Sequence, residues 1–187
     1  MPRPADAEVF QALVRRFGQD VEPEWDVAKG SEDLFDRALQ YAPRLDFAIR
    51  PFNTNARTNH EMRQQIVETG IRNLEFIEAL HASSDIPTRN LGRNPNPRCF
   101  LAIELERETS RKDRLGGIIN ASAMGIVGIV VGADEDVYRS LVRLRGYLDY
   151  LPDVGKAPAS PQNILIMTRQ SFLDVLNRPT PTMSNGS

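Results

Sequence analysis

The sequence predicts an α/β protein in three layers, with a central mixed sheet flanked by helices. Two apolar runs with the length of strands, residues 99–106 and 126–131, stand on either side of a segment with helical spacing, residues 110–124. The second run is apolar throughout, which is typical of a strand buried on both faces of a parallel sheet. A strand, a helix and a buried strand in succession predict parallel neighbours joined by a right-handed crossover. We therefore expect these two runs to be the central strands.

The other elements follow from hydrophobic spacing and from Gly, Pro and Ser at segment ends. Expected strands cover residues 25–28, 44–49 and 163–167, and expected helices cover residues 6–18, 31–42, 60–82, 137–151 and 171–176. The long segment 60–82 is predicted to be one amphipathic helix, with Gly70 as its weak point. Ser110 and Asp113 fit the capping box that would start the helix over 110–124.

Length and composition favour a single domain over residues 1–176, with its core at about 31–131 and a disordered tail over 177–187. The net charge of −2 neither indicates nor excludes a nucleic-acid partner, because a local basic patch can hide in an acidic total. The single cysteine, Cys99, excludes an internal disulfide and a multi-cysteine metal site. No apolar run has the length of a membrane span and no secretory signal is evident, so we expect no membrane partner and a cytoplasmic protein.

Two carboxylates in the strand over 99–106 are the main candidates for function. Side chains alternate along a strand, so Phe100, Ala102, Glu104 and Glu106 should share one face. At a separation of roughly 7 Å, two such charges repel by about 2 kcal/mol at an effective dielectric near 20. A divalent cation, a nearby Lys or Arg, a shared proton or exposure to water would offset this repulsion. The preceding strand, residues 44–49, adds Asp46, expected with Ala48 on the face opposite Leu45, Phe47 and Ile49.

These residues resemble the core of the PD-(D/E)XK, or restriction-endonuclease-like, nuclease superfamily. The superfamily pattern has an acidic residue on one strand, then an acidic-X-Lys on the next, followed by a helix and a strand. Asp46 and the run Glu104-Leu-Glu106 would fill these places, with Glu106 where the pattern has Lys. A further departure is the distance along the chain between Asp46 and Glu104, which is longer than the family usually has. The resemblance covers roughly residues 31–131 and implies a restriction-endonuclease-like three-layer sandwich.

The resemblance implies a nuclease dependent on Mg²⁺ or Mn²⁺ that hydrolyses phosphodiester bonds, with DNA as the favoured substrate. Asp46, Glu104 and Glu106 would be the metal and catalytic residues, and Lys112 would reach back from the next helix to stabilise the transition state. The carboxylates of Asp46 and Glu104 should then lie within about 5 Å of each other. We expect phosphate affinity to be spread over four arginines of the loop before the strand and of the helix start: Arg89, Arg93, Arg98 and Arg111.

Each assignment has an ordinary structural alternative. Asp46 would only begin a strand with a local hydrogen bond, Glu106 would be a solvated strand end, and Lys112 would belong to a solvated helix start. Asn120 lies on the same stripe of its helix as Lys112, where a polar side chain can face the site. The second hypothesis is therefore a catalytically inactive module with the same fold, which binds or assembles and pairs its acidic residues with Lys112 or Arg. The sequence leaves a homodimer or another protein partner open.

Overall fold

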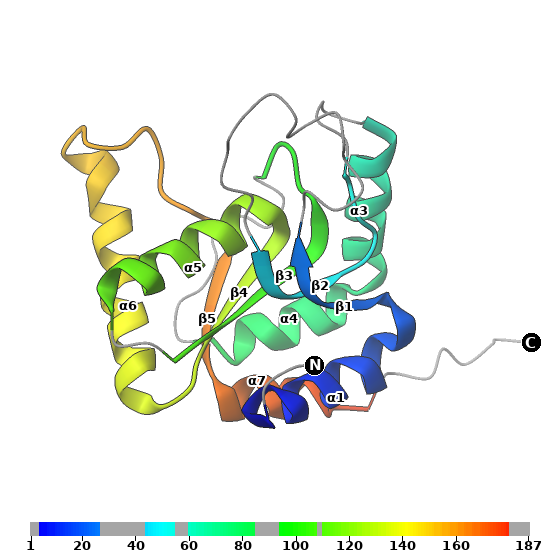
Figure 1. Cartoon of the computed structure of the whole chain (residues 1–187). Coiled ribbons are helices and arrows are strands. Elements are labelled where there is room, and N and C mark those ends of the chain that lie inside the picture. Colours follow the sequence, from blue (N-terminus) through cyan, green and yellow to red (C-terminus); the bar gives the residue numbers. More distant parts are fainter. Residues whose placement is uncertain (1–3, 27–43, 55–59, 85–93, 108–109, 180–187) are drawn as a thin grey trace, which may run out of the picture.

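The chain folds around a five-stranded mixed sheet with the strand order β1-β2-β3-β4-β5 (Figure 1). The structure, a computed structural model, describes residues 4–26, 44–54, 60–84, 94–107 and 110–179. The strand β2 (Arg44–Ile49) pairs antiparallel with both β1 (Val21–Asp26) and β3 (Cys99–Glu106). The strand β4 (Gly125–Gly132) pairs parallel with both β3 and β5 (Ile164–Thr168). The prediction of an α/β fold whose centre is β3 beside a fully buried β4 is confirmed.

Helices cover both faces of the sheet and make three layers (Figure 1). One face packs against α1 (Pro4–Phe17), α3 (His60–Arg72), α4 (Leu74–Ala82) and α7 (Arg169–Leu176), which together bury a core that includes Leu13, Phe76 and Phe172. The other face packs against α5 (Arg111–Met124) and α6 (Glu135–Asp153) over a second core that includes Ile118 and Leu141. A short 3-10 turn, η1 (Gly18–Asp20), joins α1 to β1. The predicted helix over 31–42 lies outside the described residues.

The helix α5 lies directly on the backbone of β4. A Cβ atom placed on Gly128 would come within 2.8 Å of the Ala121 carbonyl oxygen and 2.4 Å of Ile164 Cδ1. Glycine in a strand interior often marks such a close approach of another backbone. Gly128 therefore sets the spacing between α5 and the sheet.

The predicted single helix over 60–82 is wrong, because the chain breaks it into α3 and α4 at Asn73 and not at Gly70. The Asn73 side chain donates a 2.8 Å hydrogen bond to the Thr69 carbonyl oxygen, and its φ and ψ of −107° and 24° leave the helical region. An Asn side chain competes in this way with backbone hydrogen bonds of a helix. The expected capping box is also absent, since the Ser110 side chain forms no cap hydrogen bond.

Two expected face assignments are wrong. Phe100 packs in the same core as Leu101, against Phe17 of α1, and not in the core that holds Ala102. Leu45 packs in the core under α5 with its cross-strand neighbour Trp25. The edge strand β1 changes direction just before Trp25, at Glu24, whose φ of 48° is left-handed.

A cluster of neutral side chains closes the amino end of β4, where α5 ends. Asn163 is 4% exposed, donates to the carbonyl oxygens of Ser122 and Gly125 at 3.0 and 2.9 Å, and accepts a 2.7 Å hydrogen bond from the Ser122 hydroxyl. Asn94 donates to the carbonyl oxygens of Ser122, Ala123 and Gly125. The last carbonyls of a helix have no partner within it, and these two amides supply one. We call Asn94, Ser122 and Asn163 the amide cluster.

The residues directly after α7 form hydrogen bonds with other parts of the chain. Asn177 accepts a hydrogen bond from Arg15 of α1, and Arg178 donates to the Ser83 hydroxyl after α4. Residues 180–187, most of the segment expected to be a disordered tail, lie outside the described residues. Among the described helices, none combines the length and the apolar character that a membrane crossing needs.

Candidate functional site

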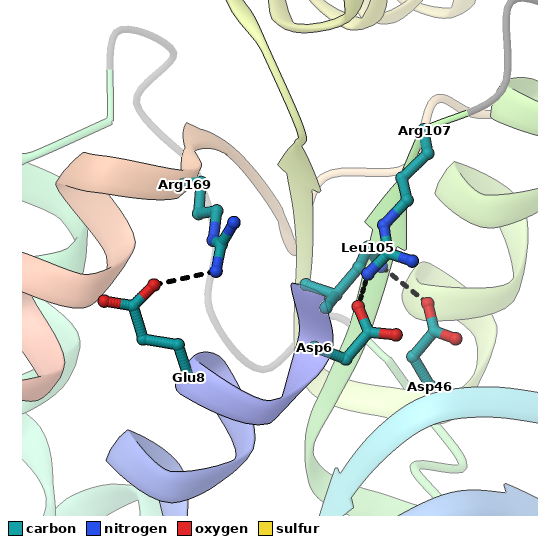
Figure 2. A network of polar contacts seen from close by, with 6 residues as sticks. All are labelled: Asp6, Glu8, Asp46, Leu105, Arg107 and Arg169. Atoms are coloured by element: carbon teal, nitrogen blue, oxygen red, sulfur yellow. Dashed lines mark hydrogen bonds and ion pairs between the residues drawn. The ribbon is translucent and has the colours of Figure 1, made fainter. Parts of the chain in front are cut away.

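The carboxyl end of β3 brings Asp46 and Glu104 together across two antiparallel strands. The ladder between β2 and β3 pairs Phe47 with Ile103, so the next residues outward, Asp46 and Glu104, are cross-strand neighbours. The Asp46 Oδ2 atom accepts a 2.7 Å hydrogen bond from the Leu105 N–H (Figure 2), and the Glu104 carboxylate accepts one from the Asp46 N–H. Beyond the last backbone pair, each carboxylate thus accepts a hydrogen bond from the opposite strand.

Glu106 lies farther along the same strand and packs against α5. It is buried, and a Cβ atom placed on Gly117 would come within 2.0 Å of its Oε1 atom. Gly117 therefore leaves the space that the Glu106 carboxylate occupies. The glycine pair Gly116-Gly117 was visible in the sequence, but only the packing of α5 shows that the second glycine serves this carboxylate.

The three carboxylates are electrostatically coupled. Burial raises the pKa of Glu104 well above its ordinary value, and the negative charges of Asp46 and Glu106 raise it further. Hydrogen bonds from the Asn120 side chain and from the Asp46 N–H to the carboxylate oppose this rise. Asp46, Glu104 and Glu106 therefore lie close enough for their charges to interact, and the Asn120 side chain faces Glu104.

This acidic cluster, Asp46, Glu104 and Glu106, has two carboxylates on neighbouring strands that are candidates for a divalent cation. Within the described residues, no group of three or more His, Cys, Asp and Glu side chains stands in an arrangement that could hold a metal ion. Mg²⁺ commonly binds through one or two carboxylates and completes its shell with water and substrate phosphate. Asp46 and Glu104 offer hard oxygen ligands of this kind, and the mutual repulsion of the cluster favours a cation there.

The predicted basic residues that the structure describes are divided between the two ends of β3. Lys112 and Arg111 lie exposed in the first turn of α5, and Lys112 forms no ion pair with any described residue. Arg98 precedes β3 and so lies at the opposite end of this strand, half-buried, with its guanidinium 3.4 Å from the Asn53 carbonyl oxygen. Burial lowers the pKa of Arg98. Arg89 and Arg93 lie outside the described residues.

Sequence reasoning missed two ion pairs that fasten the helix α1 to this edge of the sheet. Arg107, directly after Glu106, pairs with the buried Asp6, and Arg169 at the start of α7 pairs with Glu8 at 2.7 Å (Figure 2). The partners of each pair are about 100 and 160 residues apart, so no local pattern could have predicted them. The edge therefore carries two arginines that the predicted set of basic residues did not include.

A pocket of about 330 Å³ opens at the same edge, where β4 and β5 end and α6 and α7 begin. It lies one strand from the acidic cluster, because the Ala133 N–H donates a 2.9 Å hydrogen bond to the Glu106 carbonyl oxygen. Ligands of open α/β sheets bind outside the carboxyl ends of the strands. The pocket is lined by residues of these two strand ends and by Glu8, Glu135, Arg169, Gln170 and Leu173.

Comparisons of the chain with models of protein families, with curated proteins and with solved structures found no match. The nuclease resemblance therefore depends on the residues themselves and on how the fold arranges them.

Proposed function

We propose that the chain is a nuclease that hydrolyses phosphodiester bonds of nucleic acid, with DNA as the favoured substrate, at the acidic cluster. The observation that carries the proposal is the convergence of Asp46, Glu104 and Glu106 on adjoining strand ends, where Glu104 experiences the charge of both neighbours. The order of the elements, an α/β sheet with β3, α5 and β4 in succession, is compatible with a restriction-endonuclease-like sandwich. Mg²⁺ or Mn²⁺ would be the cofactor.

In this proposal Asp46 and Glu104 hold the cation, which when bound polarises the scissile phosphate and lowers the pKa of a bound water. The side-chain amide of Asn120 keeps the Glu104 carboxylate in place through its hydrogen bond. Glu106, fixed against Gly117, completes the site or orients the attacking water. Lys112 stands in for the strand lysine of the superfamily pattern, and as an exposed side chain it can reach a substrate phosphate at the start of α5.

The test is a cleavage assay with single- and double-stranded DNA and RNA, in Mg²⁺ or Mn²⁺. Glu104→Ala should abolish cleavage, and Lys112→Ala should slow it by about 10²- to 10³-fold through lost transition-state stabilisation. Binding of uncleaved substrate should survive both changes better than cleavage does. Glu68→Ala on the exposed surface of α3 is the matched control and should leave the rate unchanged. Absence of cleavage by the wild-type chain with every substrate and both metals would contradict the proposal.

A second candidate is a catalytically inactive module of the same fold that binds a partner or assembles. Two observations favour it: Glu106 occupies the place of the pattern's lysine, and Glu104 is already hydrogen bonded by Asn120 and by the Asp46 N–H. The inactive module was expected to pair Lys112 with Glu104 or Glu106, and among the described residues Lys112 makes no such pair. Nucleic-acid binding that is unaffected by Glu104→Ala, without cleavage, would favour this candidate.

A further inference from the structure

We propose that the outer face of α6 is the contact surface for a second copy of the chain, with the two α6 helices antiparallel across a two-fold axis. The proposal is independent of the acidic cluster and of the proposed nuclease activity. The helix α6 lies at the margin of the molecule in Figure 1, and its inner face packs on the sheet through Val137, Leu141 and Leu148.

The second half of α6 and the residue that follows the helix expose large apolar and aromatic side chains. Tyr147, Tyr150 and Val154 are 52%, 55% and 40% exposed. A spacing of three residues places Tyr147 and Tyr150 side by side on the helix surface, and Val154 follows as the C-cap residue of α6. Tyrosine has an apolar ring with a polar tip, so it is enriched at surfaces that become partly buried on association.

Gly146, next to Tyr147, leaves the helix surface without a side chain at this position. A Cβ atom placed there would meet no atom within 4 Å, so no packing within the chain requires the glycine. Glycine in a helix interior costs roughly 0.5–1 kcal/mol relative to alanine. A partner helix that approaches closely at this position gives the glycine a use that the single chain does not.

The charges along the outer face are complementary to themselves when the helix is reversed. Arg139 and Arg143 lie exposed before the aromatic stripe, and Asp153 lies exposed after it. Arg139 also forms a 2.9 Å ion pair with Glu135 of the same helix, which leaves its other guanidinium nitrogens to a partner. In an antiparallel pair centred between Gly146 and Tyr147, residues equally distant from the centre face each other, which sets Arg143 against the partner's Tyr150. Arg139 then lies opposite Asp153 and Val154 of the second copy. Arginine over tyrosine and arginine beside aspartate are both attractive contacts, whereas a parallel pair would set arginine against arginine.

A two-fold contact of this kind is isologous, so each favourable pair occurs twice. One helix face buries less than the roughly 1,200–2,000 Å² of a standard interface, so the dimer should be weak and dependent on concentration. The aromatic stripe begins about 20 Å along α6 from its first residue, given 1.5 Å per residue, which leaves the sheet edge with the acidic cluster open in both copies.

Sedimentation of the full chain from about 5 to about 300 µM tests the proposal, because a weak dimer dissociates within this range. The mass should rise from 21.0 kDa toward twice this value. The double variant Tyr147→Lys, Tyr150→Lys should weaken association at least tenfold with an unchanged melting temperature, since both side chains are exposed. Arg139→Asp and Asp153→Arg should each weaken it, and their combination should restore it. A chain that stays monomeric throughout the range overturns the proposal.

Cysteine crosslinking tests the register. Gly146→Cys should form an intermolecular disulfide under mild oxidation, because the position lies beside the two-fold axis. Gly116→Cys on α5 is the matched control, a helical glycine that likewise has no atom within 4 Å of an added Cβ, and it should stay unlinked. The native Cys99 is fully buried and does not interfere. Equal crosslinking at both positions, or failure of the Arg139 and Asp153 exchange to restore association, contradicts the antiparallel pairing.

Discussion

Two polar clusters lie at opposite ends of the parallel strands, and they differ in how their polar atoms are satisfied. The amide cluster at the amino end is neutral, and its side chains donate to the carbonyl oxygens where α5 ends. The acidic cluster at the carboxyl end places three carboxylates together, and burial and mutual repulsion raise the pKa of Glu104. Satisfied neutral groups stabilise a fold, whereas gathered like charges cost stability and are typical of functional sites. The contrast supports the proposal that the acidic end is the functional site, whereas the amide end is part of the framework.

The largest expected effect is at the amide cluster. Asn163→Ala removes two donors to buried carbonyl oxygens and one acceptor for the Ser122 hydroxyl, which should lower the free energy of unfolding by about 2–3 kcal/mol. For a chain of this length the melting temperature should fall by about 5–10 °C. Gln11→Ala, at an exposed amide side chain of α1, is the control and should change stability by less than about 0.5 kcal/mol. An equally small change for Asn163→Ala would contradict the stabilising role of the amide cluster.

At the acidic cluster, a substitution that keeps the shape of the side chain but removes its charge should stabilise the fold, whereas Asn163→Ala destabilises it. Glu104→Gln relieves repulsion from Asp46 and Glu106 and should raise the free energy of unfolding at pH 7 by about 1–2 kcal/mol. The Asn120 amide can turn to accept from the new amide, so the hydrogen bond is kept. Chemical denaturation of the variant, beside Glu68→Gln on the surface of α3, measures the difference. Destabilisation by Glu104→Gln would mean that the carboxylate is already compensated in the folded chain.

A divalent cation should stabilise the wild-type chain at this end and leave the amide end unaffected. A cation that binds only the native state, at ten times its dissociation constant, adds about 1.4 kcal/mol. Calorimetry should therefore show a melting temperature higher by about 3–6 °C in Mg²⁺ or Mn²⁺ for the wild type and for Asn163→Ala. Glu104→Ala should show no such shift, and equal shifts in all three chains would mean that the acidic cluster is not a metal site.

The smallest effect should be a dependence of stability on pH. Burial and the charges of Asp46 and Glu106 raise the pKa of Glu104, so the native state favours the protonated form more than the unfolded state does. The stability that Glu104 contributes is fully present below its unfolded pKa of about 4.5 and is lost as the pH rises through the folded pKa. The advantage of Glu104→Gln over the wild type should therefore grow as the pH rises above about 4.5. Unfolding curves at several pH values check this, and a constant difference would contradict it.

Local patterns predicted most of the framework that carries the acidic cluster. The periodicities of β3, α5 and β4 depend on neighbours in sequence, and the alternation in β3 correctly placed Glu104 and Glu106 together. The Asp46 side chain hydrogen bonds to the Leu105 N–H because the ladder with β3 stops at Phe47, and this end of pairing leaves no mark in either strand alone. The ion pairs of α1 with Arg107 and Arg169 also depend on packing between distant segments, so spacing could not predict them.

A substitution at Gly128, a residue without a charge or a side chain, would disturb the acidic cluster. Because a Cβ atom at Gly128 would come within 2.8 Å of the Ala121 carbonyl oxygen, any larger residue there would push α5 away from the sheet. The lifted helix would carry Asn120 away from Glu104 and Gly117 away from Glu106, although no ligand or charge had been altered. The proposed activity would therefore fall through a change in the distance between helix and sheet, at a residue with no functional group of its own.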